Sequence, residues 1–423
     1  MTQSLLDRRR VLGPAYRLFY AEPLHLVRGK GVELFDADGR RYLDAYNNVP
    51  VLGHAHPAVV EALARQASLL NTHTRYLHDA VLDYAERLVA TFPDPLIRAM
   101  FTCSGSEAND LALRIAMTAT GGNGVIVTAN AYHGVTALLA AMSPSLGLPT
   151  APTVRTVPPP DSYRGQGDVG AAFGRSVAAA VADMRRAGIG VAALLVDTTF
   201  ASDGLFFDPV DHLDEAVAAV RAAGGLFIAD EVQGGFGRSG RMWSFLRHSL
   251  VPDLVTLGKP MGNGHPIGGV VTRGDLLDIF GARSRYFNTF GGNTVSAAVG
   301  LAVLETIQSE DLPGHAARLG EQLSERLSSL RGHPSVGDIR GTGLYRGIEL
   351  VTDRETREPA TDLAKAVTDD MARNGVLIGV CGGASNVLKI RPPLAFQAAH
   401  VEELVEALDK SLSRCAGAQS RER

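Results

Sequence analysis

The sequence predicts an α/β fold, with a mainly parallel sheet covered by helices and a smaller α+β unit near the C-terminal end. Short apolar, β-branched runs bounded by Gly, Asp or Pro alternate with amphipathic stretches between about residue 97 and residue 259. Alternating strands and helices favour a parallel sheet with both faces covered. After Leu301 this alternation ends, and a long amphipathic stretch and a glycine-punctuated segment follow.

The sheet is built from five runs that are typical of buried strands. Each is short, and each is bounded by a residue that ends regular structure. The expected strands are "IRAMFT" (97–102), "NGVIVTANA" (123–131), "VAALLVDTTF" (191–200), "GGLFIADEV" (224–232) and "PDLVTLGK" (252–259). Between them lie three amphipathic helices, two of them closed by glycine: "SEANDLALRIAMTAT" (106–120), "FGRSVAAAVADMRRAG" (173–188) and "PVDHLDEAVAAVRAAGG" (209–225).

Both ends of the chain are expected to form the smaller unit. Residues 31–46, "GVELFDADGRRYLDAY", read as a hairpin whose turn is Asp38-Gly39. The C-terminal part contains an expected strand in "NVLKIRPPLAF" and a helix in "QAAHVEELVEALDKSLSR". We therefore predict three parts: an N-terminal segment (1–55) that packs with the small domain, a large cofactor-binding domain (56–305) and the small C-terminal domain (306–423).

Composition argues against nucleic acid or a membrane as a partner. The formal net charge is −4, and the only basic run is Arg8 to Arg10. The three cysteines are far apart, without metal-like spacing, as in a reducing compartment. No stretch resembles a signal peptide or a membrane span. These features predict a soluble cytoplasmic protein with a small-molecule substrate and no metal.

Three polar groups fall at the carboxyl ends of predicted strands, where open α/β sheets bind ligands. Asp230 ends "GLFIAD", Lys259 ends "DLVTLGK", and "CSGSEAND" follows "IRAMFT". Gly105 and Ser106 precede a helix whose free N–H groups favour an anion, although Ser104 and Glu107 also fit an ordinary capping box. A cofactor with a phosphate, a pyridinium nitrogen and an aldehyde needs an anion-binding site, a carboxylate and an amine. These three segments would supply that combination.

Other motifs are weaker. "GGFGRSG" (234–240) has the outline of a dinucleotide fingerprint, but no long helix follows it, so a nucleotide-binding protein stays only an alternative. Pro260 stands where a P-loop needs Ser or Thr, and no G-x-S-x-G occurs. His54 and His56 in "GHAHP" fit turn residues better than metal ligands.

Taken together, the motifs resemble those of the class III aminotransferases, a family with the fold-type I architecture that uses pyridoxal 5′-phosphate (PLP). The resemblance extends over nearly the full chain. The matching stretches, in order, are "GVELFDADGRRYLDAYNNV", "GHAHPAVVEAL", "SGSEANDLALR", "AYHG", "IADEVQGGFGRSG", "PDLVTLGKPMGNGHPIGGVV", "NTFGGNTVSAAVGLAVL", "GTGLYRGIEL" and "RPPL".

This resemblance implies a role for each candidate cofactor residue. Lys259 would form the Schiff base with PLP, Asp230 would pair with the pyridine nitrogen, and Gln233 would approach the ring's 3-oxygen. The phosphate would lie at Gly105 and Ser106, with Tyr132 and His133 covering the ring. Thr289 matches a threonine that reaches the phosphate from the neighbouring subunit, which implies a homodimer.

Several stretches are most similar to the ethanolamine-phosphate phospho-lyase branch of the family. Many relatives that bind an α-carboxylate have arginine three residues before the paired prolines, where this chain has Lys389. A lysine suits a phosphate better than a planar carboxylate. It could instead face solvent while Arg391 acts in its place. The other expected pocket residues are Asn47, Asn48, Val49, Arg75 and His78.

The expected activity is therefore elimination of phosphate from ethanolamine phosphate or a similar phosphorylated amine. The alternative is an ω-aminotransferase that moves an amino group from a primary amine or ω-amino acid to a keto acid or aldehyde. One departure bears on the substrate. Asp197 and Phe200 in "VDTTFASDG" replace polar residues that are usual in the family.

Overall fold

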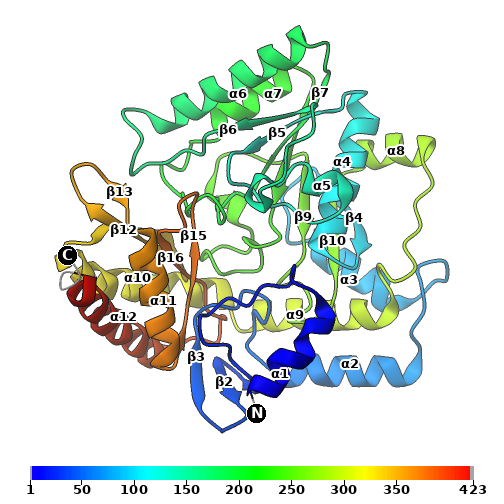
Figure 1. The fold of residues 1–423 in the computed structure, drawn as a ribbon. Coiled ribbons are helices and arrows are strands. Elements are labelled where there is room, and N and C mark those ends of the chain that lie inside the picture. The colour runs from blue at the N-terminus through cyan, green and yellow to red at the C-terminus, as the bar shows by residue number, and fades with distance from the viewer. Residues whose placement is uncertain (1, 420–423) are drawn as a thin grey trace.

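The computed structural model describes residues 2–419, and its largest sheet confirms the mainly parallel arrangement (Figure 1). The seven strands lie in the order β4-β10-β9-β8-β7-β5-β6. Neighbours from β9 to β6 are parallel, whereas β10 is antiparallel to both β9 and β4. The strands are β4 (Leu96–Thr102), β5 (Gly124–Thr128), β6 (Val154–Val157), β7 (Val191–Val196), β8 (Leu226–Asp230), β9 (Leu254–Leu257) and β10 (Gly268–Arg273).

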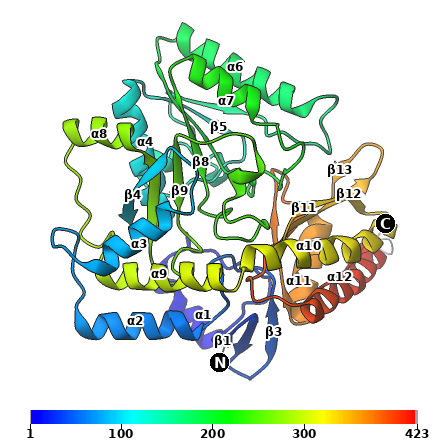
Figure 2. The ribbon, with the colours of Figure 1, turned by 180° about the vertical axis from the view of Figure 1, so that it is seen from behind.

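Helices cover both faces of this sheet because successive strand residues point to opposite sides. Val125 and Val127 of β5 pack in the same buried cluster as the apolar side of α4 (Gly105–Thr120), whereas Ile126 packs in the cluster on the other face. That second face is covered by α6 (Val169–Arg186) and α7 (Asp214–Ala222), as Figure 2 shows from behind. The helix expected at 209–225 begins only at Asp214, because residues 210–213 form turns.

The N-terminal hairpin is confirmed, and it pairs with a strand from the far end of the chain. Strand β2 (Glu33–Asp36) is antiparallel to β3 (Arg41–Asp44), and Gly39 in the turn has a φ of 84°. β3 in turn runs parallel to β14 (Val376–Leu377). With β1 (Leu26–Lys30) they form a four-stranded sheet, preceded by α1 (Thr2–Arg9).

Long helices join this sheet to the rest of the molecule. α2 (Pro57–Leu69) and α3 (Asp79–Val89) pack on α9 (Thr294–Ser309), which is continuous through residue 305.

The domain boundaries at 55/56 and 305/306 remain a prediction. The C-terminal elements are α10 (Leu312–Ser328), β11 (Val336–Thr342), β12 (Tyr345–Asp353), β13 (Glu358–Pro359), α11 (Thr361–Arg373), β15 (Gly379–Cys381), β16 (Val387–Ile390) and α12 (Ala398–Gln419).

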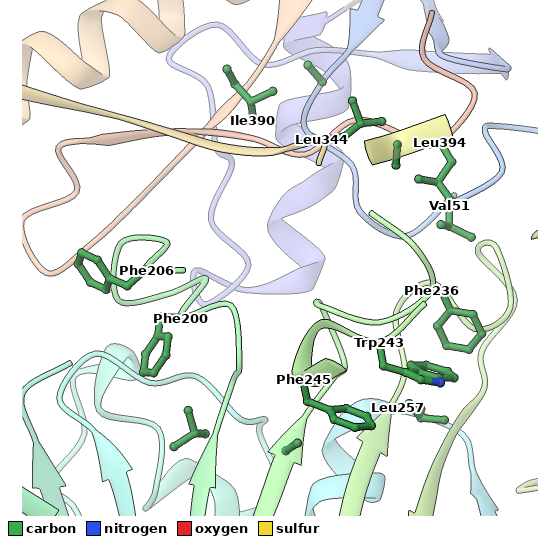
Figure 3. Packing of buried hydrophobic residues seen from close by; sticks show 14 of the residues in the cluster. Val51, Phe200, Phe206, Phe236, Trp243, Phe245, Leu257, Leu344, Ile390 and Leu394 are labelled. Carbon is green, nitrogen blue, oxygen red and sulfur yellow. The ribbon is translucent and has the colours of Figure 1, made fainter. Parts of the chain in front are cut away.

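The largest buried hydrophobic cluster links the central sheet to the C-terminal sheet (Figure 3). Leu257, at the end of β9, belongs to the same cluster as Ile390 of β16 and Leu394 beyond it. Trp243 is fully buried there, and its indole N–H donates to Thr91 O at 3.1 Å. Apolar contacts therefore continue from one sheet to the other. The carboxyl ends of the central strands lie between the two sheets and are surrounded by close-packed side chains.

The dinucleotide interpretation of "GGFGRSG" is wrong. Residues 232–239 form turns rather than the start of a helix, and Arg238 within them is fully buried. Its guanidinium donates to the carbonyl oxygen of Pro392 instead of facing a ligand. Within residues 2–419, no group of three or more His, Cys, Asp or Glu side chains is arranged to hold a metal. Nor is any helix of that range long and apolar enough to cross a membrane.

Candidate active site

The carboxyl ends of β4, β5, β7, β8 and β9 meet at one cavity of about 210 Å³. The sequence predicted that Asp230, Lys259 and the segment after β4 would meet at one rim, and the structure brings them together there. The lining residues are Ser104, Gly105, Ser106, Asn109, Tyr132, His133, Gly134, Asp197, Asp230, Val232, Gln233 and Lys259.

One wall of the cavity is the N-terminus of α4, which serves both functions that its sequence allowed. Ser104 is the N-cap and accepts a hydrogen bond from the Glu107 N–H at 3.2 Å, while the Glu107 carboxylate accepts one from the Cys103 N–H at 2.6 Å. Only the Ser104 half of the capping box forms, because Glu107 accepts from the N–H of Cys103 rather than from that of Ser104. The first N–H groups of the helix, at Gly105 and Ser106, have no partner within the helix and line the cavity, where an anion would bind.

Only glycine fits at residue 105. A Cβ there would lie 2.5 Å from Cγ1 of Val232, which lines the same cavity. The chain after β8 therefore packs directly against the helix N-terminus. The N-terminus of α4 and the chain that follows Asp230 are therefore in close contact.

Asp230 is held in place by three donors. Its Oδ2 accepts from Asn109 Nδ2 at 2.8 Å and lies 2.6 Å from His133 Nδ1, and its Oδ1 accepts from the Val232 N–H at 3.0 Å. Burial by itself would raise the pKa of this carboxyl, but the hydrogen bond and charge of His133 and the charge of Lys259 outweigh burial and hold the pKa below its usual value. Asp230 is therefore an anion inside the protein.

Lys259 projects into the cavity from the end of β9. Its side chain is partly buried, with Nζ 5.8 Å from the centre of the Tyr132 ring. Burial lowers the pKa of this lysine; the charge of Asp230 opposes the shift and that of Arg391 adds to it. The neutral amine, which is the nucleophilic and basic form, is thus favoured relative to an exposed lysine.

Gln233 connects the cavity to the N-terminal segment. Its Oε1 accepts from Asn48 Nδ2 at 3.0 Å and from Arg391 Nη1 at 2.8 Å. Because the oxygen is taken up by these donors, the amide nitrogen remains for a ligand. His133 offers another free polar atom, since its buried Nε2 has no partner in the described chain.

These groups fit PLP. An N–H cup suits the phosphate, a buried carboxylate suits a protonated ring nitrogen, and a lysine of lowered pKa suits an aldehyde. Tyr132 and Val232 lie in the cavity lining beside these groups and offer apolar surface to a ring. The orphaned nitrogen of His133 is a further sign that a polar ligand completes the site.

Arg391 and the segment from Asn47 to Val49 lie next to the cofactor cavity. Arg391 donates to Tyr46 O at 2.8 Å as well as to Gln233. Asn47 is fixed by Asp44, which accepts from its backbone N–H at 2.8 Å and from its side chain at 2.9 Å. These residues border the cavity without lining it, and their contact with substrate stays a prediction.

Lys389 does not face solvent, which removes one of the two alternatives for it. Its side chain is buried, and its ammonium donates to the carbonyl oxygen of Ala201. Burial lowers its pKa to about 7, and Arg391 adds to this effect while Cys381 and Asp197 oppose it. The amine lies behind the cavity lining and is held by the loop after β7.

The structure does not bring Arg75, His78 or Thr289 to the cavity of their own chain. Arg75 stacks over Phe287, with Cζ 3.7 Å from the ring centre, and His78 caps α3 by accepting from the Ala80 N–H at 3.2 Å. Thr289 is exposed in the loop before α9. These three residues could contribute to an active site only if they reached the cavity of a neighbouring subunit. Their roles therefore stay predictions.

Sequence reasoning did not assign five residues that line the cavity: Ser104, which was treated only as a helix cap, and Asn109, Gly134, Asp197 and Val232. Two signals were available. Asn109 lies one helical turn beyond Gly105, and Val232 lies on the same side of the strand end as Asp230. Asp197 was noted only as a departure from the family. It is partly exposed, and loss of solvation, followed by the charge of Asp230, raises its pKa.

The family model described as Aminotransferase class-III matches residues 20–412 of the chain. A protein of Arabidopsis thaliana named alanine–glyoxylate aminotransferase 2 homolog 2, mitochondrial, is 41% identical over 97% of this chain and 87% of its own length. Ethanolamine-phosphate phospho-lyase homolog 1 of Caenorhabditis elegans is 36% identical over 97% of this chain and 93% of its length. A solved phospholyase from Arthrobacter, in complex with phosphoethanolamine, is 46% identical, with a TM-score of 0.94 over 97% of this chain and 99% of that one.

Proposed function

The chain belongs to the class III aminotransferase family of PLP-dependent enzymes, and we propose that it is a phospho-lyase that acts on ethanolamine phosphate or a similar phosphorylated amine. The observation that carries this proposal is the buried side chain of Lys389, at the position where the family resemblance implies an arginine in members that bind an α-carboxylate. A lysine is a compact charge without the planar fork that grips a carboxylate, so this position favours phosphate over an α-carboxylate.

Two relatives support the same activity. The Arthrobacter protein, 46% identical, was solved with phosphoethanolamine bound, and the Caenorhabditis elegans protein is named as a phospho-lyase homolog. Both similarities extend over nearly the whole chain, so they include the C-terminal sheet that carries Lys389 and Arg391.

Each proposed role follows from where the side chain lies. When bound, PLP supplies an aldehyde that reacts with amines and a protonated ring that stabilises negative charge on the carbon next to the nitrogen. Asp230 keeps a proton on the ring nitrogen, since it is a buried anion that His133 and Lys259 stabilise. The lowered pKa of Lys259 favours the neutral amine, which can take a proton from the substrate carbon next to nitrogen. Arg391 borders the cavity and Lys389 lies behind its lining, and we propose that their positive charge favours a phosphorylated substrate.

The overall reaction balances with water as the only second reactant. A proton leaves the carbon attached to nitrogen, phosphate leaves the neighbouring carbon with the electrons of its C–O bond, and water completes the conversion to aldehyde and ammonia. No oxidant and no second substrate are required, which separates this outcome from amino transfer.

An ω-aminotransferase is the second candidate. It is supported by the 41% identical Arabidopsis thaliana relative, which is named an aminotransferase and covers as much of the chain as the phospho-lyase homolog. The same residues would hold PLP in either case. In an aminotransferase, the proton removed by Lys259 is returned elsewhere and a keto acid or aldehyde accepts the amino group.

The proposal includes a homodimer with shared active sites and a cytoplasmic location. Support for the dimer comes from exposed apolar side chains on the loops before α3 and before α9: Tyr76, Leu77, Phe287 and Phe290 are 65%, 94%, 43% and 69% exposed. Large exposed apolar groups that gather on neighbouring loops are typical of a protein interface. Thr289 lies within this set, between Phe287 and Phe290.

The decisive experiment omits any amino acceptor. PLP-loaded enzyme is incubated with ethanolamine phosphate alone, and phosphate and ammonia are measured over many turnovers. Sustained, equimolar release of both supports the phospho-lyase. If neither is released, and the cofactor converts to its pyridoxamine form when ordinary amines are added, the phospho-lyase proposal fails and the aminotransferase is supported.

A further inference from the structure

A second and larger cavity lies apart from the cofactor site, where the N-terminal sheet, α9, α10 and the segment before α12 meet. Its volume is about 550 Å³, within the range of small-molecule sites. Five of its lining side chains are basic or can become so: Lys30, His54, His56, His315 and Arg318. None of them lines the cofactor cavity.

Three helices begin at this cavity. Pro57 is the first residue of α2, Leu312 is the first residue of α10, and Gln397 immediately precedes α12; all three residues line the cavity. Helix N-termini carry partial positive charge. At α10 the Asp311 carboxylate caps the Gly314 N–H, and the Gln397 N–H donates to His400 Nδ1, so the contribution of these helices is their dipole rather than free N–H groups. Their convergence adds to the field of the basic side chains, so the cavity is suited to an anion.

Several polar groups of the cavity have no partner within residues 2–419. The ammonium of Lys30 makes no ion pair or hydrogen bond there, and the buried Nδ1 of His56 has no hydrogen-bond partner. Arg318 makes one exposed contact, 3.5 Å from Asp311. Glu310 is the one acidic side chain of the described lining, and it is likewise unpaired, so a ligand with a donor group would also be accommodated.

We propose that this cavity binds a small organic anion, whose carboxylate or phosphate lies among Lys30, His56 and the helix N-termini. The apolar part of the ligand would pack on Leu52, Leu312 and Leu394, which also line the cavity. The site is regulatory rather than catalytic, because none of the groups that fit PLP lies in it.

His54 connects this cavity to the substrate side. Its Nε2 lies 2.6 Å from Asp44 Oδ2, and Asp44 in turn holds Asn47 by two hydrogen bonds. Gly29 leaves room for His54, because a Cβ at residue 29 would lie 2.7 Å from the His54 Cβ. An anion beside His54 therefore acts on the carboxylate that positions Asn47, and occupancy of the cavity changes the apparent KM for the amine.

The binding test uses PLP-loaded enzyme and isothermal titration calorimetry with two probes, inorganic pyrophosphate and succinate. Neither contains an amine, so neither undergoes the reaction. We expect the wild type to show a binding site for one probe that the double variant Lys30→Gln/Arg318→Gln lacks, or binds at least about tenfold more weakly. The reason is the loss of charge-assisted contacts to the probe. The probe affected identifies the ligand as a phosphate or a carboxylate.

The matched control is Lys365→Gln/Arg185→Gln, which removes the same charge from exposed positions on α11 and α6. It should bind both probes as the wild type does. Identical isotherms for the wild type and the Lys30→Gln/Arg318→Gln variant overturn the proposal, as does an equal loss in the control. The titration involves no turnover, so its outcome is independent of whether the enzyme is a phospho-lyase.

Coupling is measured with His54→Gln. In the wild type the effective probe shifts the KM for the amine, whereas in His54→Gln the probe still binds but the shift is reduced. If the shift is the same in both proteins, the connection through His54 is wrong. Equilibrium unfolding of the variant checks that the fold is retained.

Discussion

Burial and charge oppose each other at Asp230, Lys259 and Lys389. Burial alone would neutralise all three groups, since it raises the pKa of a carboxyl and lowers that of an amine. At Asp230, His133 and Lys259 reverse this effect, so the carboxylate stays charged. At the two lysines burial prevails, and the pKa of each is lowered. One anion is thus held beside amines that can exist in their neutral form.

The variant Lys259→Ala tests the central base. We expect the rate of product release to fall by about 10³-fold or more, because both the covalent partner of the aldehyde and the proton acceptor are removed. Steady-state kinetics measure the loss. PLP absorbance shows whether the cofactor still enters the site, and near-wild-type turnover would contradict the assigned role of Lys259.

The lowered pKa of Lys389 predicts that kcat/KM for a phosphorylated amine depends on pH. Its pKa of about 7 means that the ammonium is present below that pH and is lost above it. We expect kcat/KM for a phosphorylated amine to fall by about tenfold between about pH 6 and pH 8 relative to Lys389→Arg, whose guanidinium stays charged. The ratio of the two profiles isolates this group from Lys259. Parallel profiles would show that Lys389 does not act on the substrate phosphate.

At the level of elements, the start of α4 depends on close contact with the chain after β8. Gly105→Ala would place a Cβ 2.5 Å from Cγ1 of Val232, so the Val232 side chain or the start of α4 must shift. We expect stability to fall by about 1–3 kcal/mol, as for other overpacked sites, together with weaker PLP binding. Chemical denaturation and titration of the apo-enzyme with PLP measure the two effects.

The control is Gly281→Ala on α8 (Gly274–Arg283), where an added Cβ meets no atom within 4 Å. In a helix this change should stabilise the protein by about 0.5–1 kcal/mol, because alanine loses less backbone entropy than glycine. PLP affinity should not change. If both variants weaken PLP binding equally, the contact between Gly105 and Val232 is not what shapes the cup.

At the level of the whole molecule, shared sites can be tested by complementation. Lys259→Ala lacks the lysine, and Thr289→Glu would repel the cofactor phosphate in the neighbouring site. Each should be nearly inactive alone. In a mixed dimer, the chain that keeps Lys259 receives a normal Thr289 from its partner, so one of the two sites is intact.

Random mixing on co-expression should therefore restore about a quarter of wild-type activity, since half of the dimers are mixed and each has one good site. Activity assays on the purified mixture, with dimer mass checked by sedimentation, measure this. An inactive mixture in which mixed dimers are demonstrably present would exclude the sharing of Thr289 between subunits.

The sequence by itself determined the parts that depend on local chemistry and on strand order. Asp230, Lys259 and Gly105 could be assigned to one rim because parallel strands bring their carboxyl ends to the same edge. The hairpin at Asp38-Gly39 followed from its turn residues. The family followed from many motifs in order, and the fit to PLP rests on the same residues.

Only the tertiary structure decided which groups are buried and what they face. Lys389 could face solvent or the interior as far as the sequence showed; packing of β16 against the loop after β7 buried it. The second cavity, from Lys30 to Gln397, combines segments that are distant along the chain, as does the pairing of β3 with β14. Burial, pKa and cavities arise from contacts between distant segments, and no local pattern records those contacts.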